Sequence, residues 1–128
     1  MIRLVGDAHM SRRFLHACLR LTPDFPLVLL VDWMDGRYGM SSDPVLLALL
    51  EEHQLIIVGF DRATMAMHAG QLTRAGRGHA GVILFRRSVS QMDYGKQARL
   101  LVEFWREASK WDWTDRIAYL PVTVAENQ

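Results

Sequence analysis

The sequence predicts an α/β fold, a three-layer α/β/α sandwich built around a mainly parallel sheet of four to five strands. Short apolar runs recur along the chain, segments with helical spacing lie between them, and the connections are short. The chain has 128 residues, half of them apolar, which suits one domain with a substantial core. We expect that domain to span residues 1–122 and the last residues, 123–128, to form a polar C-terminal tail.

The first half of the chain predicts three strands and two helices. Ser11 is a suitable N-cap for the first helix, and Thr22-Pro23 ends it because a proline ring cannot continue a helix. Ser42-Asp43-Pro44 is a strong start for the second helix, since proline is favoured at the first helical position. The expected strands are residues 2–6, 27–31 and 55–60, and the expected helices are residues 11–21 and 43–53.

The second half predicts a further strand between two helices. Its first helix is expected over residues 61–75 and is followed by a glycine-containing loop. A fourth strand is expected over residues 82–85, and a long amphipathic helix over residues 90–110. A short element at residues 117–124 would add a fifth strand. The order of strands and helices indicates a parallel sheet covered on both faces.

Composition and charge limit the partners and the cellular compartment that we expect for this protein. The formal net charge is +1, so charge alone predicts no nucleic-acid partner. A single cysteine, Cys18, excludes an internal disulfide and suits a reducing cytoplasm. The chain starts with a strand-like run that bears a charge, and its longest wholly apolar run covers only residues 27–31. We therefore expect neither a signal peptide nor a membrane partner, and a cytoplasmic location.

Three aspartates lie where ligands gather in open α/β sheets. Asp7 follows the first expected strand, Asp61 follows the third, and Asp43 begins the helix that leads into the third. Ligand sites of such sheets lie at the carboxyl ends of the strands. Carboxylates gathered there suit Mg²⁺ or Mn²⁺, which prefer oxygen ligands. Spacing alone leaves a second interpretation open: Asp43 and Asp61 precede helices, where aspartate is a favoured cap.

Several segments together resemble a known family. They are residues 2–7, an opening strand and acid; 42–49, an acidic helix start; 55–61, a central strand and acid; 79–85; and 117–121. In order and spacing they resemble the small bacterial PIN-like proteins related to VapC-type ribonuclease toxins. The resemblance covers nearly the whole chain.

The resemblance implies a metal-dependent endoribonuclease and the toxin half of a toxin–antitoxin pair. Asp7, Asp43 and Asp61 would then be the catalytic residues and would hold Mg²⁺ or Mn²⁺. The metal would activate water for attack on a phosphodiester of RNA. A cognate antitoxin protein would be the expected partner.

Other positions depart from the family pattern and support an alternative. Ala8 stands where relatives often carry a second acid, Gly59 where they often carry Thr or Ser, and Ala63 where they usually carry a further Asp. These differences favour a degenerate PIN-like protein that acts as a partner-binding or regulatory module. A small phosphotransfer domain is a third possibility, disfavoured because both lysines, Lys96 and Lys110, fall on the last expected helix or at its end.

Flanking residues supply candidate substrate contacts. Arg12 and Arg62 lie within about one helical turn of a candidate acid, and His9 lies two residues after Asp7. We expect these three to line the RNA-binding surface, although a solvated helix face or an exposed loop would also explain them. The Trp- and Met-rich segments suit either core packing or an interface, including a homodimer.

Overall fold

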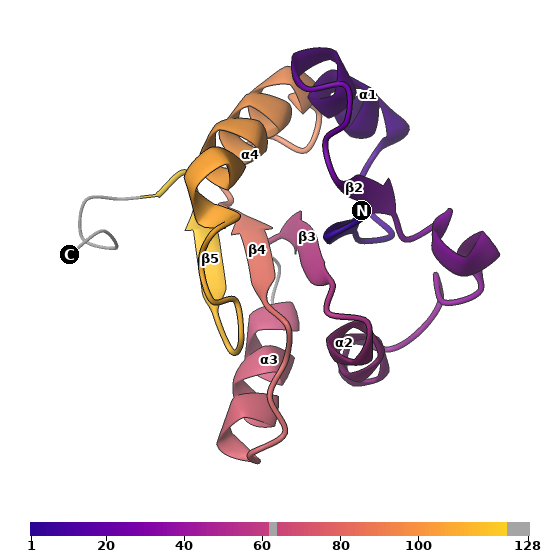
Figure 1. Cartoon of the computed structure of the whole chain (residues 1–128), viewed down its shortest axis with the longest axis vertical. Helices are drawn as coiled ribbons and strands as arrows, with labels where there is room; N and C mark the ends of the chain where they lie inside the picture. Colours follow the sequence, from indigo (N-terminus) through magenta and orange to yellow (C-terminus); the bar gives the residue numbers. More distant parts are fainter. Residues whose placement is uncertain (62–63, 123–128) are drawn as a thin grey trace.

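The computed structural model describes residues 1–61 and 64–122. It confirms the α/β class: a five-stranded, all-parallel sheet lies between two layers of helices (Figure 1). The strand order across the sheet is β2-β1-β3-β4-β5. The strands are β1 (Leu4–Gly6), β2 (Leu27–Leu29), β3 (Ile56–Phe60), β4 (Val82–Phe85) and β5 (Ile117–Leu120).

The helices begin and end at positions set by local capping. They are α1 (Arg12–Leu21), the 3₁₀ helix η1 (Trp33–Gly36), α2 (Asp43–Glu52), α3 (Met65–Arg74) and α4 (Tyr94–Ala108). Ser11 caps α1 by accepting the Arg13 backbone N–H at 3.0 Å. Helix α4 begins later than expected because Asp93 is its cap, accepting the Lys96 backbone N–H at 3.1 Å.

Each face of the sheet has its own hydrophobic core. Helices α1 and α4 cover one face, and α2 and α3 cover the other (Figure 1). On the first face Phe14 of α1 meets Phe85 of β4 edge to face, with ring centroids 5.9 Å apart. Both rings are fully buried. Strand β2 is shorter than expected because the chain enters a turn at Leu30, which is still buried, and Val31 is 44% exposed.

The crossovers on either side of β4 have opposite hand. Connections β3–α3–β4 and β4–α4–β5 step in the same direction across the sheet. Their helices nevertheless pack on opposite faces, α3 with α2 and α4 with α1. Nearly all such crossovers in proteins are right-handed, so one of these two is of the uncommon kind. The chain therefore leaves β3 toward one face and β4 toward the other, an arrangement that opens a crevice at the carboxyl ends of the strands.

The tryptophans in and just after the last turns of α4 are mainly core residues, as their spacing indicates. Trp105 and Trp113 are 6% and 4% exposed, and the Trp113 indole N–H donates to the Ala108 carbonyl oxygen at 2.7 Å. Trp111 stacks on Trp113 with centroids 6.0 Å apart and is 37% exposed. The guanidinium of Arg116 lies 4.9 Å from the centroid of the Trp111 ring, a cation–π contact.

A buried histidine ties the start of β4 to the turn before β5. His79 is 1% exposed, and its Nδ1 accepts the Gly81 backbone N–H at 3.1 Å. The Asp115 carboxylate accepts the His79 backbone N–H at 3.1 Å and the Thr73 hydroxyl at 2.9 Å. Burial lowers the pKa of His79, and the nearby charge of Asp115 only partly opposes that shift.

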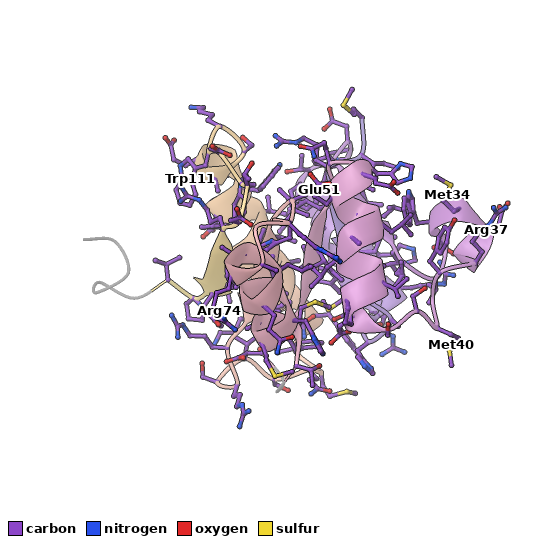
Figure 2. All side chains as sticks on the ribbon, turned by 90° about the horizontal axis from the view of Figure 1, so that it is seen from below. Met34, Arg37, Met40, Glu51, Arg74 and Trp111 are labelled. Atoms are coloured by element: carbon purple, nitrogen blue, oxygen red, sulfur yellow. The ribbon has the colours of Figure 1, made fainter. Side chains whose placement is uncertain are left out.

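The segment between β2 and α2 projects from the β2 edge. Trp33 is buried there against Tyr38 and His53, with ring centroids 5.7 and 5.2 Å away. Met40 is almost fully exposed and Met34 is 41% exposed, and Figure 2 shows both on this projecting segment. None of the described helices combines the length and apolar character needed to cross a bilayer.

Candidate functional site

Two of the three predicted acids lie at the carboxyl ends of adjacent central strands. Asp7 follows β1, and its backbone N–H donates to the Val58 carbonyl oxygen at 2.9 Å. Asp61 follows β3, and its backbone N–H donates to the Phe85 carbonyl oxygen at 2.8 Å. Each acid thus continues the sheet hydrogen bonding one residue past its strand. The helix after β1 and the helix after β3 cover opposite faces, so this is a switch point of the topology, where open α/β sheets bind ligands.

Gly59 makes the room that the Asp7 carboxylate occupies. One carboxylate oxygen of Asp7 accepts the His9 backbone N–H at 2.8 Å, and the other lies against Gly59 of the neighbouring strand. A Cβ atom at residue 59 would overlap that second oxygen well inside van der Waals contact. The departure from Thr or Ser at this position therefore has a steric role: it lets a carboxylate lie across the edge of β3.

Asp43 reaches the same edge of the sheet by a different route. It is the first residue of α2, and its carboxylate accepts the Thr64 hydroxyl at 2.6 Å. Thr64 is the N-cap residue of α3, three residues after Asp61 in the chain. This bond joins α2 to the segment that follows β3, so Asp43 lies beside that segment on the α2–α3 side of the sheet.

Neither Asp43 nor Asp61 is the N-cap residue of the helix that follows it. The N-cap residue of α2 is Ser42, and that of α3 is Thr64. Asp61 lies four residues before Met65, which begins α3, so it is outside the cap position. Asp43 is the acidic residue in the first turn of α2, and its carboxylate accepts the Thr64 hydroxyl.

The three acids share one edge but do not form a ready-made cluster. Within residues 1–61 and 64–122, no group of three or more His, Cys, Asp or Glu side chains is arranged to hold a metal ion. Asp43 is directed to Thr64, and Asp7 to His9 and Gly59. A Mg²⁺ ion needs only one or two protein carboxylates when waters and substrate phosphates complete its shell. Asp7 and Asp61 have the hard oxygen donors for such a site.

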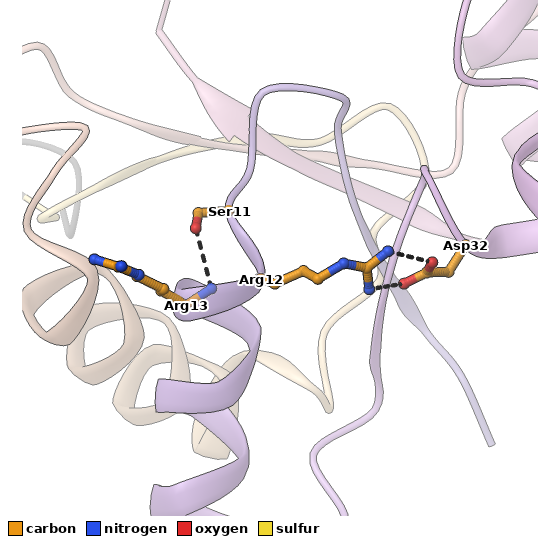
Figure 3. A network of polar contacts seen from close by, with 4 residues as sticks. All are labelled: Ser11, Arg12, Arg13 and Asp32. Atoms are coloured by element: carbon orange, nitrogen blue, oxygen red, sulfur yellow. Dashed lines mark hydrogen bonds and ion pairs between the residues drawn. The ribbon is translucent and has the colours of Figure 1, made fainter.

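Arg12 is engaged by an acid that the sequence analysis overlooked. Its two terminal nitrogens donate to the two carboxylate oxygens of Asp32, both at 2.7 Å (Figure 3). This hydrogen-bonded pairing lowers the pKa of Asp32 and raises that of Arg12. Asp32 follows the apolar run of residues 27–31, the same pattern that identified Asp7 and Asp61. That signal would have found it.

The remaining predicted contacts have different surroundings. His9 is exposed, and its backbone, not its ring, makes the bond to Asp7. Arg62 and Ala63 lie outside the described residues. Cys18 is fully buried, and burial raises the pKa of its thiol to about 12. At neutral pH it is therefore a core residue and not a nucleophile.

A cavity of about 440 Å³ opens between the ends of β3 and β4, where the two chain directions diverge. Its floor is apolar, from Phe60 and Phe85, and its rim carries Asp61 with Arg86 and Arg87. The Arg87 Nε–H donates to the Asp61 carbonyl oxygen at 3.3 Å. Arg86 donates through Nε to the Pro121 carbonyl oxygen at 2.8 Å. The Arg86 guanidinium also lies 5.3 Å from the centroid of the Tyr119 ring, so it is engaged in the structure, whereas Arg87 is exposed. An exposed guanidinium beside a carboxylate suits a phosphate ester that also meets a cation.

The pocket is one of the features that periodicity could not predict. In the sequence, Arg86 and Arg87 form a basic pair directly after the strand β4. The face of the sheet to which the chain turns after β4 depends on the hand of the β4–α4–β5 crossover, which periodicity does not reveal. No family model, curated protein or solved structure matches this chain. The resemblance to PIN-like nucleases therefore stays a prediction from the sequence, and the site is described by its own geometry.

Proposed function

We propose that this protein is a divalent-metal-dependent endoribonuclease, with Asp7 and Asp61 as principal metal ligands and Asp43 as a third catalytic acid. The observation that carries the proposal is the position of Asp7 and Asp61 at a switch point, with Gly59 shaped to receive the Asp7 carboxylate. Mg²⁺ or Mn²⁺ bound there would lower the pKa of a coordinated water for attack on phosphorus. The acids would hold the ion, and Arg87 would orient the scissile phosphate from the adjacent cavity.

The toxin role follows as the biological part of the same proposal. The resemblance to VapC-type toxins implies a partner protein that restrains the nuclease. The projecting segment with exposed Met34 and Met40 is a candidate surface for an antitoxin or for a second copy of the chain. Induced expression should arrest bacterial growth for the native chain and not for Asp61→Asn. Equal arrest by both would reject the toxin role.

Cleavage and metal binding test the chemical part directly. We expect the native chain to cleave single-stranded RNA in Mn²⁺, and Asp7→Asn and Asp61→Asn to lose at least about a hundredfold in rate, equivalent to about 2.7 kcal/mol. Asp24→Asn removes the same charge at an exposed position between α1 and β2 and should leave the rate unchanged. Calorimetry with Mn²⁺ should show binding that Asp7→Asn weakens. Identical Mn²⁺ binding in both, or none at millimolar metal, contradicts the proposal.

The alternative is a partner-binding module on the same scaffold. It is favoured by the absence of a three-ligand group among the described residues and by the neutralisation of Arg12 by Asp32. This alternative predicts a folded protein that neither binds Mn²⁺ nor cleaves RNA. Cleavage that persists in Asp61→Asn would indicate a contaminating nuclease and would leave this alternative in place.

A further inference from the structure

A second concave surface lies beside the first, between α1 and the start of α4. This groove has a volume of about 410 Å³. Its α1 wall carries Arg13, His16 and Arg20, and its other wall is the turn that leads into α4. The three α1 residues are three and four positions apart, which places them on one stripe of the helix. All three are exposed.

The groove is cationic because its two lining arginines outnumber its one acid, and a further arginine lies close to it. Asp93 is the acidic residue of the lining, and its carboxylate caps α4 through the Lys96 backbone N–H at 3.1 Å. Arg99 lies one turn further along α4, and a Cβ built on Gly95 would be 3.4 Å from its Nη1. Its guanidinium therefore lies next to Gly95, which lines the groove. Such a concentration of positive charge stands out on a chain whose net charge is only +1.

One turn separates the groove from the cavity beside Asp61. Val89, Ser90 and Gln91 line the cavity, and the residues that follow them line the groove. The turn is held in place by Gln97, a fully buried residue of α4 whose side-chain amide donates to the Ser90 carbonyl oxygen at 2.8 Å. The two basic concavities are therefore fixed relative to each other, on the two sides of a single turn.

The shape and chemistry of the groove favour an extended polyanion. Tyr94 is half-buried: it packs partly against the core and also lines the groove wall. Cations that follow a groove, with an aromatic side chain in its wall, are typical of surfaces that bind single-stranded nucleic acid. A flat membrane surface would engage a convex patch and would not need the groove.

We propose that this groove binds the sugar–phosphate backbone of single-stranded RNA and feeds the strand past residues 89–93 toward the cavity beside Asp61. The choice of RNA rests on the proposed function. Binding itself requires neither metal nor the aspartates, so the two proposals can fail separately.

The test is the affinity for a fluorescein-labelled single-stranded RNA, measured by anisotropy in EDTA. We expect Arg13→Gln/Arg20→Gln to weaken binding by about tenfold or more and to reduce the slope of log K against log salt by about 1.4, since each lost phosphate contact removes about 0.7. The matched control is Arg74→Gln/Arg77→Gln, which removes the same charge elsewhere. Arg74 is the last residue of α3 (Figure 2), and Arg77 lies in the loop after it. Its affinity should stay close to that of the native chain.

Further variants make the outcome decisive. Arg13→Lys/Arg20→Lys retains the charge and should recover most of the affinity, which a folding defect would not allow. Equal losses in the groove pair and the control pair would overturn the groove proposal, as would native binding to anionic vesicles but not to RNA. Groove-dependent RNA binding without Mn²⁺-dependent cleavage would reject the proposed nuclease and leave the groove proposal standing. Cleavage whose kcat/KM is unchanged in Arg13→Gln/Arg20→Gln would reject the groove proposal and leave the proposed nuclease standing.

Discussion

Asp7 and Asp32 both follow apolar strands of the same sheet, yet their environments differ. Asp7 lies between central strands, where the backbone holds it: the His9 N–H binds one oxygen and Gly59 leaves space for the other. Asp32 lies beyond the edge strand β2, where a long side chain, Arg12, pairs with both of its oxygens. The comparison teaches that one sequence pattern, an acid after an apolar run, leads to two environments. Backbone groups shape the space around the central acid, and an arginine side chain pairs with the acid at the edge.

The largest expected effect is that of Gly59→Ala. The added Cβ would overlap the Asp7 carboxylate, so β3 or Asp7 must shift, and we expect a loss of about 1–3 kcal/mol in the free energy of unfolding. Urea denaturation measures this loss. Gly95→Ala in α4 is a matched control of opposite sign, because alanine stabilises a helix by about 0.5–1 kcal/mol relative to glycine.

A double-mutant cycle shows whether the cost arises at Asp7. Removal of the carboxylate in Asp7→Ala should relieve the overlap, so Gly59→Ala should cost much less in the Asp7→Ala background. Additive costs would mean that Gly59 matters for another reason, and the contrast between centre and edge would lose its basis.

The alkylation rate of Cys18 measures whether a substitution beside Asp7 or Asp32 loosens the hydrophobic core. Its thiol is buried and has a pKa of about 12, so alkylation at pH 8 should be slow and should require opening of the core. We expect Gly59→Ala to speed labelling by the factor that its stability loss sets, about 5- to 150-fold for 1–3 kcal/mol. Arg12→Gln should leave the rate unchanged. Rapid labelling of the native chain by iodoacetamide would contradict the buried position of Cys18.

A smaller effect is expected at His79, which precedes β4 and so lies at the opposite end of the strands from the acids. Its folded pKa lies below the ordinary value of 6.5, so the unfolded chain binds a proton that the folded chain resists. The contribution of His79 to stability is complete above pH 6.5 and declines as the pH falls below it. His79→Asn keeps an acceptor for the Gly81 N–H and should flatten this decline in urea titrations from pH 7.5 to about 5. An unchanged pH dependence would assign the effect to other groups.

The smallest expected effect is that of Arg12→Gln. The pair is exposed, and exposed ion pairs contribute little to stability. The variant should melt close to the native chain, while the pKa of Asp32, followed by NMR of its carboxyl carbon, should rise toward its ordinary value of 3.8. A marked loss of stability would show that the β2 edge depends on this pair as the centre depends on Gly59.

Local patterns predicted the elements of this fold because their causes are local. Ser11 acts as the expected cap, and α2 begins at Asp43 as the Ser-Asp-Pro sequence indicates. The predicted three-layer class is confirmed for the same reason, since the alternation of apolar runs and helical spacing suffices to define it.

The site was harder to predict because its contacts are distant in the sequence. Thr64 and Asp43 are 21 residues apart, and no periodicity relates them. In the sequence, Gly59 stands where the resemblance implies a Thr or Ser hydroxyl. Only the register of β3 beside β1 reveals that the Asp7 carboxylate fills the space beside it. The chain turns to one face of the sheet after β3 and to the other face after β4. That difference depends on the hand of a crossover, which composition does not encode.

That crossover also bears on synthesis at the ribosome. Helix α1 packs against α4, which ends at Ala108, although β1 and β2 on either side of α1 are complete by Leu29. The nascent chain therefore holds an apolar helix face without its cover until α4 has left the ribosome. An unpaired surface of this kind is a natural substrate for chaperones, and the native packing of α1 depends on a helix that is synthesised much later.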